Sequence, residues 1–459
     1  MASQNKETMK MMIVSSTSVK PTYDCSPPPS TTAHIPLTAF DKLAYDGQEG
    51  IIYAYRPPAV PTATLKQGLQ KVLSVYREYA GRFGKNQKGE DVILLNDRGV
   101  RFVEASVDSR LNQSMASLLK PSRALLSLHP PMKGVDELLQ VQITRFACGS
   151  MVIGLTAHHK VADGHSTGNF LVAWGRACRG LDIGPLPLHD RSSIFTLLNP
   201  PQNNEFDHHW MEYTSKRTLD LKGEAGLLDD IVMHKVHFSA GFMRTLKARA
   251  SQSSKSSEPD IGNYNDKRPT YSTFECLSAH LWRAITRARS LNAHETTQMR
   301  IAVNGRSRMN PMVSNEYLGN LVLWATPKAM VKDLLAQPIF HVAKLIHEEI
   351  AKVDERYFRS FINFTESTKF KDDPDTILIS AVGNPVICPD VSVNSWLRLP
   401  LNDLDFGCGS PYMLMPTYYP IEGLIYILPS YVEDGSIDVF INLFTGQLDP
   451  FTQNCNVLD

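Results

Sequence analysis

The chain has 459 residues, of which 42% are hydrophobic and 20% are charged, a composition typical of a globular enzyme. Its 47 basic residues balance 47 acidic ones, so the net charge provides no electrostatic footprint for nucleic acid or an anionic membrane. A chain of this length exceeds the size at which one hydrophobic core usually stops growing, which predicts two domains.

The N-terminal segment and the cysteines indicate a cytoplasmic protein. Residues 1–21 lack the apolar core of a signal peptide, and no window of about 18 apolar residues predicts a membrane span. The seven cysteines are scattered, odd in number and without metal-site or redox-motif spacing, which indicates reduced thiols. Asp207, His208 and His209 are consecutive, but neighbouring side chains diverge and no further ligand follows at a recognised interval. No metal site is therefore expected.

Strand-like and helix-like segments alternate along the first half. Alternating or continuous apolar runs predict strands at residues 12–18, 50–55, 92–96, 100–105, 138–146 and 150–157. Apolar residues at helical spacing predict a helix at 62–76. Turn residues at 97–99 and 148–149 separate two of the strand pairs and predict two hairpins.

A polar, proline-containing connection divides the chain. It predicts a first domain at 1–190, a crossover linker at 191–230 and a second domain at 231–459. The second half repeats the pattern, with a serine-rich surface loop expected at 251–266. Its expected strands are 232–238, 391–397, 424–428 and 437–443, and its expected helices are 274–290 and 329–354. The fold class is therefore α/β, with mixed sheets and covering helices.

Residues 157–164 read AHHKVADG and carry the most informative pattern in the chain. They place His159 four residues before Asp163, with Gly164 directly after the acid, between a strand-like run at 151–156 and a helix-like run at 167–176. Such a turn presents an imidazole at the mouth of a cleft, where it can accept a proton near neutral pH. The alternatives are a solvated turn after a buried strand, and His158 as the base in place of His159.

A second motif reads DFGCG at residues 405–409. Together with HHKVADG it resembles the BAHD acyltransferases of plants, which pair HxxxDG with a distal DFGWG. Further segments resemble that family in family order: IVSSTSVKP (13–21), IPLTAFD (35–41), STFECLSAHLWRA (272–284), VNGRSRMNP (303–311), YLGNLVLWA (317–325) and NSWLRLP (394–400). The resemblance implies two similar chloramphenicol-acetyltransferase-like domains with the active site at their interface.

Within the family, several passages resemble the hydroxycinnamoyl-CoA:amine branch: YREYAGRFG (76–84), ILLNDRGVRFVEA (93–105), QITRFACGS (142–150) and GNFLVAWGRACRG (168–180). That branch moves coumaroyl, caffeoyl or feruloyl groups from CoA to amines such as putrescine or agmatine. The competing function is O-acylation of shikimate, quinate or another alcohol. Enzymes of that type typically hold the acceptor carboxylate with an Arg some fifteen residues before the Trp that corresponds to Trp396, and residues 376–393 contain no Arg. The amine acceptor is therefore favoured.

The resemblance also implies roles for individual residues. His159 would be the general base, and Asp163 would shape the turn. Asn394 and Trp396 are candidate donors to the oxyanion, because side chains two residues apart share one face of a strand; the alternative for Trp396 is a core aromatic. Thr38 and His158 are expected at the substrate, with Asp41 as a turn residue. The residues expected near CoA are Ser272, Thr273, Arg306 and Arg398.

The DFGCG segment is expected to be structural, and the set that supports the fold is Gly164, Asp405, Phe406, Gly407 and Gly409. Arg306 is alternatively the ion-pair partner of Asp405. Cys408 replaces the Trp of the family motif and is expected to pack as a small residue, with no activating base nearby.

The expected substrates are an acyl-CoA, used as a co-substrate with no permanently bound cofactor, and a small amine. Neither nucleic acid nor membrane is expected as a partner, and nothing in the sequence indicates an oligomer. The cationic far end of a diamine would favour an acid or an aromatic face. Nearby candidates in the sequence are Tyr412, Tyr418, Tyr419 and Glu422, of which Glu422 is expected to serve the fold. The rival to an enzyme is a silent binder, but the intact HxxxDG motif favours catalysis.

Overall fold

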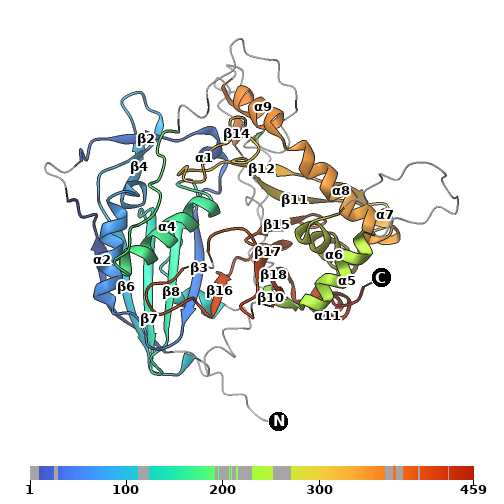
Figure 1. Ribbon diagram of the computed structural model, residues 1–459. Helices are drawn as coiled ribbons and strands as arrows, with labels where there is room; N and C mark the ends of the chain where they lie inside the picture. Colours follow the sequence, from blue (N-terminus) through green and yellow to red (C-terminus); the bar gives the residue numbers. More distant parts are fainter. Residues whose placement is uncertain are drawn as a thin grey trace, which may run out of the picture.

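The computed structural model describes residues 10–24, 29–111, 123–191, 195, 206, 208, 213–215, 230–251, 270–366, 376–378, 386–401, 404–432 and 434–458. Most of the expected linker at 191–230, and all but the first residue of the expected loop at 251–266, lie outside these ranges. Figure 1 shows two lobes, each built on a large twisted sheet with helices packed on it.

The first sheet has six strands in the order β1-β6-β7-β8-β3-β16. Their bounds are Met11–Val19, Val100–Val107, Leu139–Phe146, Met151–His158, Gln48–Tyr55 and Met413–Pro416, respectively. β6 and β7 are parallel, and the other neighbours are antiparallel. The edge strand β16 comes from the second half of the sequence, so residues from both halves build this sheet.

Two helices, α2 (Thr62–Leu73) and α4 (Gly164–Cys178), pack side by side on the first sheet (Figure 1). Their apolar stripes are fully buried, as helical spacing of Leu65 and Leu69 on α2 predicts. The buried Trp174 on α4 donates its indole N–H to the carbonyl of Leu65 at 3.0 Å. This packing fixes the axis of α4, and with it the position of the turn at the helix N-terminus.

The second sheet has the order β10-β18-β17-β15-β11-β12, and β13 pairs with β11. The bounds are Ile231–Phe238, Ile437–Phe444, Leu424–Pro429, Val391–Ser395, Thr296–Asn304 and Val322–Ala325, with β13 at Lys328–Met330. β15 runs parallel to both of its neighbours, β11 and β17. Its central place puts the residues that follow it at the middle of the sheet, where they face the first lobe.

Helices of the second lobe cover its sheet around a separate hydrophobic core. They are α5 (Ala240–Ala250), α6 (Thr273–Ala288), α7 (Val331–Ala336), α8 (Ile339–Lys352), α9 (Glu355–Glu366) and α11 (Thr445–Asn454). α6 is buried along most of its length and packs against α5, α8 and α11. Shorter elements complete the description: α1 (Ala39–Leu43), a sheet of β2 (His34–Pro36), β5 (Asp91–Leu94) and β4 (Arg82–Lys85), and the pair β9 (Tyr213–Ser215) and β14 (Thr376–Leu378).

The expected hairpin around residues 97–99 is wrong, whereas the one around 148–149 is confirmed. β5 pairs with β2 and β4, while β6 pairs with β1 and β7, so the two strands belong to different sheets. Asp97 and Gly99 both have positive φ, which sharply redirects the chain. Arg77 holds Asp97 at 3.0 Å and thereby fixes the exit toward β6. The turn residues were identified, but they connect two sheets.

The expected single helix at 329–354 is also divided. β13 occupies its first residues, and α7 ends before Gln337, whose backbone is extended with ψ 146°. Pro338 follows and precedes α8, and proline disfavours helical backbone in the residue before it. One proline therefore separates two helices within a continuous helical pattern.

Candidate active site

The turn between β8 and α4 is held by Asp163. Its carboxylate accepts the backbone N–H of Ser166 at 3.0 Å and so caps α4, and it also accepts the backbone N–H of Leu321 at 3.1 Å. Arg306 contacts both of its oxygens, at 2.8 and 3.1 Å. Burial alone would raise the pKa of Asp163, but the Arg306 charge and these hydrogen bonds hold it below its ordinary value. Asp163 is thus an ionised anchor of the turn.

Arg306 belongs to this anchor, which excludes the expected contact with CoA phosphates. Its side chain is 2% exposed and also donates to Ser166 Oγ at 2.8 Å and to the carbonyl of Tyr317 at 3.2 Å. The alternative partner, Asp405, is wrong as well, because Asp405 pairs with Arg179 at 3.3 Å. The guanidinium of Arg306 is therefore committed to joining the HxxxDG turn to the second half of the chain.

His159 lies at the start of the same turn and faces a cavity. The side chain is 26% exposed, and its Nε2 lies 3.6 Å from Oε2 of Glu49, which is longer than a hydrogen bond. Its Nδ1 is buried without a hydrogen-bond partner among the described residues. The backbone is fixed at both ends, by an N–H bond to the carbonyl of Gly47 at 3.0 Å and by the Asn320 amide, which donates to the His159 carbonyl at 2.9 Å.

A buried carboxylate, Asp41, supports this arrangement from the side. It accepts both the backbone and side-chain N–H groups of Asn320 at 3.0 Å and pairs with Arg191 at 2.7 Å. Because Asn320 also holds the His159 carbonyl, Asp41 does more than shape its own turn. It helps to fix the main chain of His159 relative to the second half of the chain.

His158 occupies a different environment from its neighbour. Its ring packs edge-on against Phe83, with centroids 4.7 Å apart, and Nε2 lies 3.6 Å from Asp46. Burial lowers the pKa of His158 to about 4, although the Asp46 charge opposes the shift. The side chain is absent from the described residues that line the His159 cavity. These features separate it from the chemistry expected of His159.

The cavity beside His159 has a volume of about 200 Å³ and is walled by both halves of the chain. Asn394 on β15 and Trp396 just after it line the cavity, so the structure brings both expected donors to the same space as His159. Trp396 is 9% exposed and packs edge-on against Tyr426, with centroids 5.2 Å apart. Its aromatic body is therefore part of the core, while the residue still reaches the cavity.

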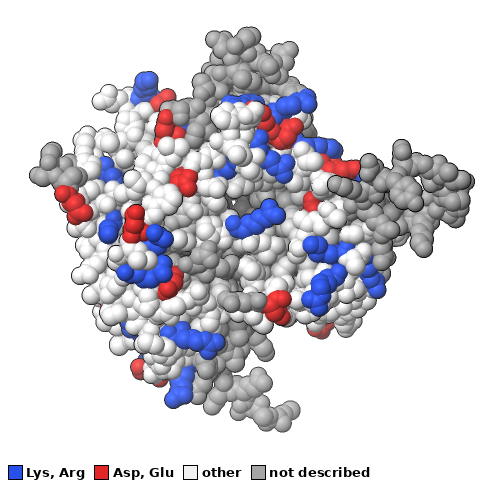
Figure 2. Space-filling model, viewed as in Figure 1, with Lys and Arg blue, Asp and Glu red and all other residues white. Residues whose placement is uncertain are grey.

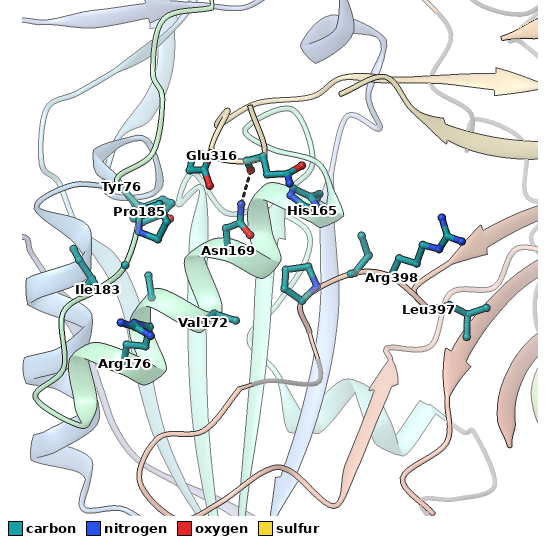
Figure 3. A pocket seen from close by; sticks show the side chains of 15 residues that line it. Tyr76, His165, Asn169, Val172, Arg176, Ile183, Pro185, Glu316, Leu397 and Arg398 are labelled. Atoms are coloured by element: carbon teal, nitrogen blue, oxygen red, sulfur yellow. Dashed lines mark hydrogen bonds between the residues drawn. The ribbon is translucent and has the colours of Figure 1, made fainter. Parts of the chain in front are cut away.

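A larger space of about 630 Å³ adjoins this cavity and shares His165 and Leu399 with it. Figure 3 shows His165, Asn169 and Arg176 along one side of α4, with Arg398 on the segment that follows β15. Arg398 is exposed, whereas Nε of Arg176 donates to the carbonyl of Asp182. An exposed guanidinium that lines this space, which shares residues with the His159 cavity, suits a long, charged substrate.

Thr38, Ser272 and Thr273 are not brought together with His159. Thr38 caps α1: its Oγ1 accepts the N–H of Asp41 at 3.2 Å and donates to the carboxylate of Asp41 at 2.8 Å. Ser272 caps α6 in the same way and accepts the N–H of Glu275 at 3.2 Å, directly before Thr273, the first residue of that helix. None of the three is among the described residues that line either space.

Gly164 begins α4 and lines the His159 cavity. Gly164 does not have the left-handed backbone that favours glycine, because it is not among the glycines with positive φ. A Cβ at this position would instead lie 2.9 Å from Leu399 Cδ1. A larger residue here would have to displace the end of the Leu399 side chain, on the segment after β15.

The DFGCG segment lies at the other end of α4. Asp405 accepts the N–H groups of Gly407 at 2.7 Å and Gly409 at 2.9 Å, and both glycines have positive φ. Phe406 is buried and packs on Trp174 of α4, with centroids 4.7 Å apart. Cys408 packs against the first core, and burial raises the pKa of its thiol, so the thiolate needed for nucleophilic attack is disfavoured.

None of the four candidates for the acceptor's far end is among the described residues that line the cavity. Tyr418 donates to the carbonyl of Ile231. Tyr419 donates to the carbonyl of Gln48, and the Tyr412 ring lies under Arg56. Glu422 forms a fully buried ion pair with Arg289, the fold role expected of it.

Sequence reasoning missed Glu49, Tyr45 and Tyr426, all of which line the cavity. One signal was present: Glu49 is the one acid of β3, directly before the apolar part of that strand. Its partner His159 lies 110 positions later, and only the pairing of β3 with β8 brings them together. No cluster of residues that could hold a metal ion occurs in the described ranges, where His208 contacts Ser360; Asp207 and His209 lie outside them.

No helix in the described part of the chain is long and apolar enough to cross a bilayer. On the face seen in Figure 2, acidic and basic side chains are interspersed over both lobes.

Comparisons with known proteins agree with this architecture. Vinorine synthase, a solved structure, is 23% identical, with a TM-score of 0.70 over 98% of this chain and 99% of its own. Putrescine hydroxycinnamoyltransferase 3 of Oryza sativa subsp. japonica is 44% identical over 97% of this chain and 99% of its own length. Agmatine coumaroyltransferase-1 of Hordeum vulgare is 43% identical over 98% of this chain and 100% of its own length. Shikimate O-hydroxycinnamoyltransferase of Nicotiana tabacum is 31% identical over 95% of this chain and 97% of its own length.

A sequence model described as the Transferase family matches residues 9–458, nearly the whole chain. The match spans both lobes, and it includes the HxxxDG turn and the DFGCG segment. With relatives above 40% identity over almost their full length, the chain belongs to this family, the BAHD acyltransferases.

Proposed function

We propose that this enzyme transfers a hydroxycinnamoyl group from its CoA thioester to an amine such as putrescine or agmatine, releasing a phenolamide and free CoA. The observation that carries the proposal is a histidine facing an acid, Glu49, in a cavity walled by both halves of the chain. A carboxylate suits a cationic acceptor better than a neutral alcohol. The amine-acylating relatives at 43–44% identity support the same acceptor class.

His159 is the proposed general base. Its Nε2 takes a proton from the acceptor nitrogen as that nitrogen attacks the thioester carbonyl carbon. The negative charge that develops on the carbonyl oxygen needs preorganised donors. The Asn394 amide and the Trp396 indole N–H are the proposed donors, since both line the cavity opposite the HxxxDG turn. Both substrates are bound together, and the acyl group passes directly between them.

An acceptor panel tests the proposed function. Coumaroyl-CoA is paired in turn with putrescine, agmatine, tyramine, tryptamine and shikimate, and the products are identified by mass spectrometry. We expect amides from putrescine or agmatine, with a kcat/KM at least tenfold above that for shikimate. The reason is that the cavity contains the carboxylate of Glu49, which no described Arg neutralises. A tenfold preference corresponds to roughly 1.4 kcal/mol. Product from shikimate and none from any amine would establish the alternative, O-acylation.

The larger adjoining space is the proposed entry for the CoA arm, with Arg398 contacting its phosphates. Ser272 and Thr273 remain weaker candidates for this role, because they cap α6 and are absent from its described lining. Arg398→Ala is expected to raise the KM for coumaroyl-CoA by roughly 10-fold, the scale of one charge-assisted contact, and to leave the KM for the amine unchanged. Equal KM values for coumaroyl-CoA in wild type and Arg398→Ala would show that Arg398 does not contact the CoA phosphates.

The proposed organisation is two acyltransferase domains, 1–190 and 231–459, joined by a linker at 191–230, acting as a cytoplasmic monomer. The six cysteines in the described ranges are unpaired, as suits a reducing compartment. Size-exclusion chromatography with light scattering tests the monomer, for which the expected mass is 51.3 kDa.

A further inference from the structure

Glu49 is directed at His159 by the register of two paired strands. On β3 it lies opposite Ala157 of β8, and directly opposite residues in an antiparallel pair share one face of the sheet. His159 lies one residue past the end of β8, and its N–H bond to the Gly47 carbonyl at 3.0 Å continues the pairing with the chain before β3, so it emerges on the same face as Ala157. The side chains meet with Oε2 of Glu49 at 3.6 Å from Nε2 of His159. The placement therefore follows from the fold and does not depend on a flexible loop.

Among the described residues, His159 is the one ion-pair partner of Glu49. The other acids around this turn are each paired with a cation: Asp163 with Arg306, Asp41 with Arg191, and Asp46 with Lys160. Glu49 is 32% exposed and lines the cavity without a permanent cation. It is thus the acid that remains available to a ligand at this turn.

Two tyrosines line the same cavity as this carboxylate. Burial, together with the negative charge of Glu49, raises the pKa of Tyr45, which lines the cavity, and raises that of Tyr426 on β17 in the same way. Tyrosine rings are favourable neighbours for a cation, and a low local dielectric strengthens the attraction of a cation to the carboxylate. A cationic group in this cavity would therefore be bound more strongly than a hydroxyl.

The 3.6 Å separation lets one nitrogen bridge the two atoms from the side. An ammonium nitrogen can lie about 2.9 Å from both atoms at once, because 3.6 Å is less than twice that distance. We propose that Glu49 is the specificity-determining residue that binds the reacting ammonium of the acceptor beside His159 and so selects amines over alcohols. This inference rests on the proposed function and identifies Glu49 as the residue that recognises the positive charge of the acceptor.

The proton balance gives Glu49 a defined role. The bound ammonium loses a first proton through His159 to water, which leaves a neutral amine held against the base. Its lone pair forms the C–N bond to the thioester carbonyl carbon, and the nitrogen gives a second proton to His159. The C–S bond then breaks, and that proton passes to the departing sulfur, so amide, CoA thiol and one solvent proton result. Glu49 offsets the imidazolium charge at both stages.

The test compares Glu49→Gln, which removes the charge but keeps the shape, with Glu49→Asp, which restores it. Glu104→Gln is the matched control, because Glu104 lies in the same sheet with similar side-chain exposure, 28%, and pairs with Lys66 far from the cavity. With putrescine as acceptor, Glu49→Gln is expected to lower kcat/KM by roughly 10- to 100-fold, the scale of one charge-assisted hydrogen bond. Glu49→Asp recovers part of the loss, and Glu104→Gln behaves as wild type.

Two further readouts separate ammonium binding from a structural role. In wild type, the KM for total putrescine stays nearly constant between pH 7 and 9, since an alkylamine with a pKa near 10.4 is protonated throughout. In Glu49→Gln only the neutral amine binds, and its fraction rises about tenfold for each unit by which the pH rises. The KM for total putrescine therefore falls by about tenfold per unit of rising pH. Replacing putrescine with 4-aminobutan-1-ol leaves the effect of Glu49→Gln unchanged, because both offer the same reacting nitrogen.

Three results would overturn the proposal. An unchanged KM in Glu49→Gln, or a KM with the same pH dependence as wild type, would show that Glu49 does not bind the ammonium. A loss confined to putrescine, with 4-aminobutan-1-ol unaffected, would assign Glu49 to the distal cation. If wild type acylates only alcohols, the proposed function fails together with this inference; if wild type makes amides and Glu49→Gln is unaffected, the inference fails alone.

Discussion

Replacing His159 with glutamine is expected to lower kcat by about 10²- to 10⁴-fold, the contribution of a positioned general base. Glutamine preserves hydrogen bonding but cannot accept the proton from the acceptor nitrogen. The fold should survive, because the backbone of His159 is held by Gly47 and Asn320 through main-chain groups. The measurement is release of free CoA from coumaroyl-CoA with saturating putrescine, together with a thermal unfolding scan to verify the fold.

The neighbouring histidine provides the matched comparison. His158→Gln is expected to keep most of the activity, because the ring packs on Phe83 and is neutral at pH 7, its pKa being lowered to about 4 by burial. It also lies outside the set of described residues that line the cavity. The opposite pattern, with His158→Gln inactive and His159→Gln active, would transfer the base to His158 and contradict the geometry.

Local pattern was sufficient to predict the elements that present His159. The apolar runs at 138–146 and 150–157 and the glycine turn at 148–149 predicted β7 and β8 to within one residue, and the helix-like run at 167–176 predicted the body of α4, which begins three residues earlier. These features depend on side chains within a few positions of each other, where the periods of strand and helix apply. The same holds for β15, which carries Asn394 to the cavity.

Contacts between distant segments could not be predicted in this way. Arg306 pairs with Asp163 across 143 positions, and residues 413–416 join the first sheet as β16. Glu49 reaches His159 only because β3 and β8 pair in one register, and a shift of one residue would turn it to the other face. Thr38 shows the converse error, since a hydroxyl in a family-like segment was assigned to the pocket and instead caps α1.

Arg306→Met is expected to lower the free energy of unfolding by about 3–5 kcal/mol, the usual cost of removing one partner from a buried ion pair. The change leaves the carboxylate of Asp163, which is 3% exposed, without its counter-charge. It also removes donors from Ser166 Oγ and the Tyr317 carbonyl. Activity should fall as well, because the same contacts join the HxxxDG turn to the second half of the chain. Urea unfolding followed by tryptophan fluorescence measures the loss.

A second ion pair on the same helix is the control. Arg179→Met removes the contact with Asp405, where the two side chains are 32% and 26% exposed, and should cost about 0–1 kcal/mol. The double variant Arg306→Met with Asp163→Asn should recover part of the stability lost in Arg306→Met, because asparagine still caps α4 but carries no charge. Equal losses for the two arginine variants would contradict a buried, uncompensated Asp163.

The stability difference between wild type and Arg306→Met should also depend on pH. The pKa of Asp163 is lowered in the folded protein, where Arg306 and hydrogen bonds outweigh burial, so the unfolded state binds its proton first as the pH falls. The pair therefore contributes its full stability above the ordinary aspartate pKa of about 3.9, and that contribution is lost as the pH falls toward and through the lower folded value. In Arg306→Met, burial acts without the opposing guanidinium, so the carboxyl protonates at a higher pH than in wild type. Protonation removes the uncompensated buried charge in Arg306→Met. The difference in the free energy of unfolding between wild type and Arg306→Met should therefore become smaller on acidification from pH 7 to 4. A gap that is constant over this range would show that the cost of Arg306→Met arises from lost packing and hydrogen bonds, and that the charge of Asp163 is compensated from elsewhere.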